Sequence, residues 1–327
     1  MSLSKGMDLS KSVTILDIFV KLNQGEAVSK EDLADKYGKD ERTIQRYIKE
    51  IKDYYLFCQP NKKTAIKYDP EKEGHRLING QGEFLNCREI LAVCKILFES
   101  RAFNREEINL LVDKLLNLAS PRQRQEIRKM ILNELYHYTP TRHEKDLIEV
   151  IWDVNQAIKE QRIISLEYKK GNGDVIKREI KPMGLMFSEY YFYMLVEMKK
   201  QLDDYKIPYR LDRIIDYQIK EEHFKVPYSD RFEEGEFRKR IQFMFPGKIT
   251  KIKLKYWGAS LEAVLDRLPT ARVVEEKDDY YIVKAEVYSQ GIKTWLLGQA
   301  QYIELLEPES LRKNIKETIN KMSRIYS

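Results

Sequence analysis

Residues 28–54, VSKEDLADKYGKDERTIQRYIKEIKDY, constrain the fold most, because they contain the start and stop signals of two short helices separated by a tight turn. Ser29, followed three residues later by Asp32, resembles a capping box and predicts the start of the first helix. Gly38 is expected to end that helix. Asp40 is then a suitable N-cap for the second helix.

The second helix is predicted to bury one stripe and expose a polar face. Ile44, Ile48 and Ile51 recur at i, i+4 and i+7, which is the spacing of a buried helix face. Basic and amide side chains of this kind bond base edges or phosphates when a helix lies in the major groove. The candidate DNA-binding residues at the turn and on this outer face are Lys39, Arg42, Thr43, Gln45, Arg46 and Lys49.

A charged outer face is also ordinary on any amphipathic surface helix, so the flanking segments matter. Upstream, residues 15–22 carry apolar side chains at helical spacing and predict a third helix. Downstream, residues 64–68 and 75–78 are strand-like runs on either side of a hairpin tip at 69–74. Three helices and a two-stranded wing predict a winged helix-turn-helix, in which Lys67 contacts phosphate. The other wing cations are Lys62, Lys63, Lys72 and Arg76.

Composition sets the frame around this module. A chain of 327 residues accommodates two or three domains, and its net charge of +6 is mildly basic. We expect a cytoplasmic protein without a membrane segment, because no apolar run approaches 18 residues and no export signal begins the sequence. Cys58, Cys87 and Cys94 are too far apart for a disulfide framework or a metal site, and the last two are expected to be core thiols.

The pattern changes twice after the wing. Residues 81–143 have helical periodicity and predict a helical connector, and one more helix follows at 147–158. Short strand-like runs then recur from residue 163 to residue 219, with a glycine-containing hairpin turn at 170–174. Short strands at such intervals favour a small antiparallel barrel.

Several of these segments resemble the WYL-domain transcriptional regulators, in which a winged helix-turn-helix precedes a WYL domain and a C-terminal WCX extension. Residues 42–46, RTIQR, are similar to the family's RTIQRD recognition helix, with Tyr47 in the place of an aspartate. Arg178 and Pro182 match its R-x-V-x-P strand. Residues 192–194, FYM, occupy the place of the Trp-Tyr-Leu signature, so its tryptophan and leucine are replaced here.

Two further motifs extend the resemblance over nearly the whole chain. Residues 209–214, YRLDRI, are similar to the family's FRLDRI segment. Residues 295–311 resemble the W-L-x-x-G…V-x-V-L-x-P-x-x-L ending of the WCX extension. The resemblance implies an Sm-like, SH3-type barrel that senses a ligand, in some members nucleic acid or a nucleotide, and so changes how the winged helix engages DNA.

Cations and tyrosines of the strand segments support an anion site. Arginine offers a planar fork to phosphate, and tyrosine can stack on bases. Arg210 and Arg213 are three apart, so a bend near Asp212 is required for both to reach one pocket. Alternatively, Asp212 pairs with one arginine and the tyrosines fill the core. The candidate ligand-binding residues are Tyr168, Arg178, Tyr193, Tyr209, Arg210 and Arg213.

The C-terminal third is predicted to form a separate domain. Residues 226–245 are interpreted as a linker. Strand-like alternation at 249–256 and 280–287, with helices at 261–268 and 292–297, indicates a β-α-β-β-α-β order. The outline is ferredoxin-like if residues 302–306 form its last strand. A closing helix at 308–325 follows.

Together these patterns predict an α+β multidomain protein: a winged helix-turn-helix at 1–80, a helical connector at 81–143, an Sm-like/SH3-type β-barrel (WYL) at 144–225, a linker at 226–245 and a ferredoxin-like WCX domain at 246–327. No catalytic constellation, metal-ligand spacing or cofactor motif is present, so we expect no enzyme, no metal and no cofactor.

The predicted function is a ligand-responsive transcriptional regulator. It is expected to be a homodimer that binds a double-stranded operator with an inverted repeat and senses an anionic ligand such as single-stranded nucleic acid or a nucleotide. The alternative is a non-transcriptional accessory protein of nucleic-acid processing or phage defence that binds single-stranded nucleic acid through the WYL domain.

Overall fold

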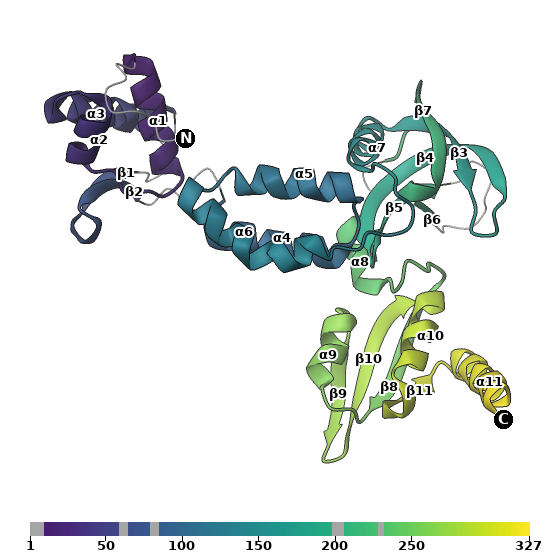
Figure 1. Ribbon diagram of the computed structural model, residues 1–327. Coiled ribbons are helices and arrows are strands. Elements are labelled where there is room, and N and C mark those ends of the chain that lie inside the picture. The colour runs from purple at the N-terminus through teal and green to yellow at the C-terminus, as the bar shows by residue number, and fades with distance from the viewer. Residues whose placement is uncertain (1–9, 59–64, 79–84, 198–205, 228–231) are drawn as a thin grey trace. The chain divides into compact units, whose positions relative to one another are not determined.

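A computed structural model describes residues 10–58, 65–78, 85–197, 206–227 and 232–327 (Figure 1). The chain divides into two compact units, residues 1–140 and 141–327, and each is described by itself.

The first unit begins with three helices and a hairpin. The helix boundaries follow their capping residues: Ser29 Oγ accepts from the Asp32 amide at 3.4 Å, Gly38 adopts a left-handed φ of 60°, and Asp40 Oδ1 accepts from the Thr43 amide at 2.8 Å. The strands pair antiparallel. These elements are α1 (Lys11–Asn23), α2 (Lys30–Tyr37), α3 (Glu41–Cys58), β1 (Ala65–Asp69) and β2 (Gly74–Ile78).

One apolar core joins these helices to the hairpin. The predicted stripe of α3, Ile44, Ile48 and Ile51, is buried against Ile18 of α1 and Leu33 of α2. The hairpin is held to the start of α2 by two backbone hydrogen bonds between Val28 and His75, each 2.8 Å long. The hairpin is therefore fixed relative to α3.

A bundle of three helices completes the first unit, as the helical periodicity of this region indicates (Figure 1). Asn86 caps the first of them with a full capping box. Cys94 is fully buried in the bundle core, where burial raises the pKa of its thiol, as expected of a core cysteine. The helices are α4 (Cys87–Ser100), α5 (Arg105–Leu116) and α6 (Pro121–Tyr136).

The second unit starts with a helix and a five-stranded antiparallel sheet of order β6-β5-β4-β3-β7. Strand β4 continues through Pro182 as one strand of 14 residues. A register shift between Pro182 and Gly184 accommodates the proline without ending the strand. The elements are α7 (Ile148–Glu160), β3 (Arg162–Lys169), β4 (Val175–Ser188), β5 (Tyr191–Glu197), β6 (Ile207–Arg210) and β7 (Ile214–His223).

The expected linker at 226–245 is not a plain connection, because helix α8 (Glu234–Arg240) lies within it. Phe237 of α8 is buried with Met186 of β4 and Leu195 of β5. Isolated apolar residues in a charged segment gave no helical period, so the sequence did not reveal this contact.

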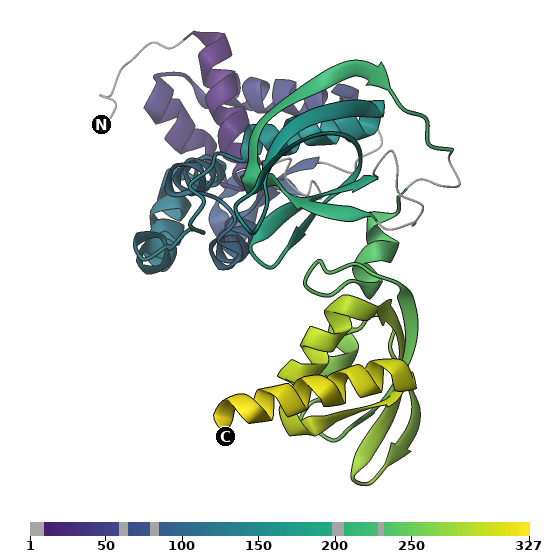
Figure 2. The same cartoon turned by 90° about the vertical axis from the view of Figure 1, so that its right-hand side faces the viewer.

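The second unit ends with a four-stranded antiparallel sheet of order β11-β8-β10-β9. Helices α9 and α10 cover one face, where Val264 and Trp295 pack on Leu254 and Val283. The last helix, α11, packs beside β11 and α10 (Figure 2). The elements are β8 (Ile249–Tyr256), α9 (Leu261–Arg267), β9 (Arg272–Lys277), β10 (Tyr280–Tyr288), α10 (Ser289–Gly298), β11 (Ile303–Glu307) and α11 (Glu309–Tyr326).

Candidate nucleic-acid and ligand sites

The outer face of α3 presents four of the predicted DNA-binding side chains to solvent. Arg42, Gln45, Arg46 and Lys49 are exposed, whereas the stripe on the opposite side of the helix is buried. Donors of this kind on one exposed helix face match the chemistry of base edges and phosphates in a major groove.

Two other residues of the predicted set occupy different positions. Thr43 donates its hydroxyl to Asp40 Oδ2 at 2.8 Å, so this side chain completes the helix cap. The hydrogen bonds that Asp40 accepts from Thr43, chiefly the one from its side chain, lower the pKa of the Asp40 carboxyl. Lys39 lies half-buried in the turn before α3.

The hairpin contributes fewer available cations than its sequence suggests. Lys67 and Lys72 are exposed. Arg76, in contrast, is paired with Asp69 at 3.1 Å, which ties β2 to the end of β1. Lys62 and Lys63 lie outside the described residues.

The five-stranded sheet brings two of the three predicted ligand-site tyrosines together, whereas Tyr193 packs against a different cluster. Tyr168 of β3 and Tyr209 of β6 are both buried, with ring centroids 4.5 Å apart. The Tyr168 hydroxyl accepts a hydrogen bond from the Arg210 amide at 3.1 Å. Burial raises the pKa of both tyrosines, while Arg213 acts to lower the pKa of Tyr168 and Arg178 that of Tyr209. Both hydroxyls therefore lie within electrostatic range of a guanidinium group.

The bend required between the two arginines of the YRLDRI segment is present as a 3-10 turn at Leu211–Arg213, which separates β6 from β7. In this turn Asp212 accepts from Arg210 Nε at 3.0 Å and from Nη2 at 2.6 Å. The Arg210 guanidinium also lies 3.3 Å from the centroid of the Tyr191 ring. Burial acts to lower the pKa of Arg210, but the Asp212 hydrogen bonds outweigh burial and raise it. Arg210 is thus held in place by its neighbours.

Arg178 and Arg213 differ from Arg210, because neither forms an ion pair with any described residue. Arg178 is exposed and lies opposite Leu166 in the β3–β4 register, so it shares the face of the sheet that carries Tyr168. Arg213 lies beside the β3–β4 turn, where a Cβ on Gly171 would be 3.4 Å from its Nη1.

Tyr193 and Tyr191 lie on one face of β5, because they are two residues apart on a strand. Tyr193 is the register partner of Arg210, and burial raises the pKa of its hydroxyl while Arg210 acts to lower it. Tyr191 was not among the residues predicted from the sequence. The i, i+2 alternation with Tyr193 was the signal that could have identified it.

The described part of the chain contains no group of three or more His, Cys, Asp or Glu side chains placed to hold a metal ion. Within the same residues, no helix combines the length and the apolar character needed to cross a membrane.

Comparison with known proteins assigns two of these regions. A WYL domain model matches residues 149–219, and a WCX domain model matches residues 250–323. No curated protein sequence matches the chain.

Two solved structures show low similarity. Proteasome accessory factor B/C (PafBC) of Arthrobacter aurescens is 13% identical with a TM-score of 0.29, and the match covers 96% of this chain and 48% of that chain. A CRISPR Cas-related protein is 12% identical with a TM-score of 0.37, covering 100% of this chain and 88% of that chain. The chain therefore spans about half the length of the PafBC chain. The FYM and YRLDRI motifs lie within the first match and the motif at 295–311 lies within the second, so the chain carries a WYL domain followed by a WCX domain.

Proposed function

We propose that this protein is a DNA-binding transcriptional regulator whose WYL domain senses an anionic ligand. The observation that carries the proposal is the outer face of α3, where Arg42, Gln45, Arg46 and Lys49 are exposed above a buried isoleucine stripe. A polar outer face is ordinary on a surface helix, but these four donors lie on the helix that follows the turn after α2, where donors of this kind reach base edges and phosphates in a helix-turn-helix.

The domain assignments form part of the same proposal. Three helices followed by a hairpin that is bonded to Val28 support a winged helix-turn-helix within residues 1–80. Helices α4, α5 and α6 support a helical connector within residues 81–143. The five strands within residues 144–225 support an Sm-like, SH3-type barrel. The β-α-β-β-α-β element order and the strand order β11-β8-β10-β9 support a ferredoxin-like domain within residues 246–327.

Arg178 and Arg213 are proposed as the cations that bind the anionic ligand. Each lies near a buried tyrosine hydroxyl and has no carboxylate partner among the described residues. An anion that entered here would gain two guanidinium groups without first displacing an acid. Arg210 holds the 3-10 turn, and Tyr193 lies beside it.

A homodimer in the cytoplasm is the proposed functional form. One recognition helix reads only a few base pairs, so two-fold pairing on an inverted repeat supplies specificity. Exposed apolar side chains on the helical connector and on α11 provide candidate dimer surfaces, and they include Ile96, Leu132, Tyr136, Ile319 and Ile325.

The test is to select duplexes from a random DNA pool with the full chain and to repeat the selection with Gln45→Ala/Arg46→Ala. The wild-type protein should enrich one short sequence arranged as an inverted repeat, and the variant should enrich none. Equal affinity of the wild-type protein for all duplexes would overturn the proposal. Sedimentation should show a dimer on the selected duplex.

A further inference from the structure

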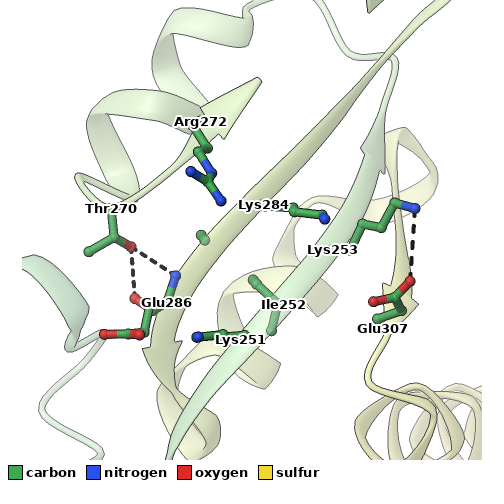
Figure 3. A pocket seen from close by; sticks show the side chains of 9 residues that line it. Lys251, Ile252, Lys253, Thr270, Arg272, Lys284, Glu286 and Glu307 are labelled. Carbon is green, nitrogen blue, oxygen red and sulfur yellow. Dashed lines mark hydrogen bonds and ion pairs between the residues drawn. The ribbon is translucent and has the colours of Figure 1, made fainter. Parts of the chain in front are cut away.

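The open face of the four-stranded sheet in the WCX domain carries a row of cations at one register level. Lys253 of β8 lies directly opposite Lys284 of β10, and Lys284 lies directly opposite Arg272 of β9 (Figure 3). Like charges directly opposite each other destabilise a sheet. Such a row therefore has a cost in the free protein that a bound anion would relieve.

This face lies opposite the one covered by α9 and α10. Along β8, Ile252, Leu254 and Tyr256 are buried in the core, so the alternating lysines point the other way. The cations border a hollow of about 420 Å³ (Figure 3). Thr270 fixes its rim, because its hydroxyl bonds the backbone oxygen and amide of Glu286 at 2.7 and 3.1 Å.

The carboxylates of this face already have cationic partners. Glu307 lies 3.8 Å from Lys253, Glu286 accepts from Arg240 Nε at 2.8 Å, and Glu304 pairs with Arg312 at 2.5 Å. Glu275 pairs with Lys277 at 3.3 Å. Among the described residues, no ion pair forms at the remaining cations of the face, which are Lys251, Lys255, Arg272 and Lys284.

Aromatic rings lie farther along the same face. The Lys255 ammonium lies 4.0 Å from the centroid of the Tyr280 ring and 5.9 Å from that of Trp257, whose side chain is 40% exposed. Tyr280 and Lys284 are four residues apart on β10, a distance of roughly 13 Å in a strand. Along its strands, this face therefore carries aromatic rings at one end and the row of cations farther on.

We propose that this face binds single-stranded nucleic acid, with phosphates on Lys253, Lys284 and Arg272 and unpaired bases stacked on Tyr280 and Trp257. Four-stranded sheets with exposed aromatic rings bind single-stranded bases in this manner, and a cationic groove follows the backbone. A ligand that consists of phosphate alone would make no contact with the aromatic rings. A duplex would hide its base faces from them. The proposal does not depend on the WYL-domain site.

The test measures binding of a labelled ten-nucleotide single strand to the full chain over a salt series. Arg272→Ala/Lys284→Ala should weaken binding and reduce the slope of log affinity against log salt by about 1.4, because each phosphate contact on a single strand contributes roughly 0.7. The matched control is Lys316→Ala/Lys321→Ala, which removes the same charge from exposed positions of α11 and should bind as the wild type does.

Two further measurements locate the site. Tyr280→Leu/Trp257→Leu keeps apolar side chains but removes both rings, and it should weaken binding about tenfold or more. Bromodeoxyuridine in the strand should photo-crosslink to peptides that contain Tyr280 or Trp257. The proposal is overturned if both double variants bind as the control does, if crosslinks form only outside this sheet, or if an abasic strand or a duplex of the same length binds equally well.

Discussion

Asp212 holds Arg210 by two hydrogen bonds, at 3.0 Å from Nε and 2.6 Å from Nη2, within the 3-10 turn between β6 and β7. The Tyr191 ring also contacts this guanidinium, whose Cζ lies 3.3 Å from the ring centroid. Arg210 is therefore held by a carboxylate and an aromatic ring, and it positions the turn. Its backbone amide also donates a hydrogen bond to the Tyr168 hydroxyl. Arg178 and Arg213, in contrast, form no ion pair with any described residue.

Asp212→Asn should destabilise the WYL domain by about 2–3 kcal/mol, because it leaves a partly buried guanidinium without its charged partner. The carboxylate of Asp212 is only 5% exposed, so water replaces it poorly. Urea unfolding followed by near-ultraviolet circular dichroism measures the change. The matched control is Asp216→Asn on β7, an exposed position that should alter stability little. Equal stability of the two variants would show that the pair contributes nothing to the turn.

Arg178→Ala/Arg213→Ala should abolish the coupling between ligand and operator while it leaves the fold intact. Titration of nucleotides and short single strands into the wild-type protein should change operator affinity by about 1–3 kcal/mol, which is the usual size of such a coupling. Arg210→Ala should instead lower the melting temperature. A double variant that retains the full coupling would place the sensing site elsewhere.

The sequence predicted those parts of the fold whose signals are local. The boundaries of α2 and α3 follow from Ser29, Gly38 and Asp40, and the bend in the YRLDRI segment follows from strand geometry. Helix α8 was missed because its one buried residue, Phe237, acquires a partner only from β4 and β5. The predicted β-α-β-β-α-β order requires a strand before residue 280, but the sequence did not locate β9, because all six of its side chains are exposed and show no alternation.

The site was predicted only in part for a related reason. Periodicity can place arginines and tyrosines on strands, but it does not show which of the two arginines pairs with Asp212. The choice of Arg210 over Arg213 depends on the 3-10 turn and on Tyr191, which lies some twenty residues away in the chain. The cation row of the WCX sheet likewise exists only through the register of three strands.

Arg46→Ala and Gln45→Ala should each reduce the preference for operator over random DNA by about 1–3 kcal/mol, if the lost contact is bidentate to a base. Lys67→Ala on the hairpin should weaken binding to all sequences alike, because a phosphate contact carries no sequence information. Competition binding on operator and random duplexes distinguishes the two effects. Lys52→Ala, at an exposed position farther along α3, is the control. An unchanged specificity ratio for Arg46→Ala would mean that another face of the helix reads DNA.

Tyr37 of α2 should make the first unit lose stability at alkaline pH. Its hydroxyl donates to Asp17 Oδ2, which also pairs with Lys36 at 3.0 Å. Burial, followed by the hydrogen bond to Asp17, raises the pKa of Tyr37 to about 12 from its ordinary value of 10.0. Because the folded-state pKa is the higher one, the stabilisation is fully present below pH 10 and is lost as the pH rises toward 12.

The loss amounts to about 1.4 kcal/mol for each pH unit in that interval. Tyr37→Phe removes the titrating group, so the difference in unfolding free energy between the wild type and this variant should shrink between pH 10 and pH 11. Tyr68→Phe, at an exposed position on the hairpin, should retain the alkaline loss of the wild type. Denaturant unfolding at a series of pH values measures all three proteins. Parallel curves for the wild type and Tyr37→Phe would show that the Tyr37 hydroxyl ionises as readily in the folded chain as in the unfolded one.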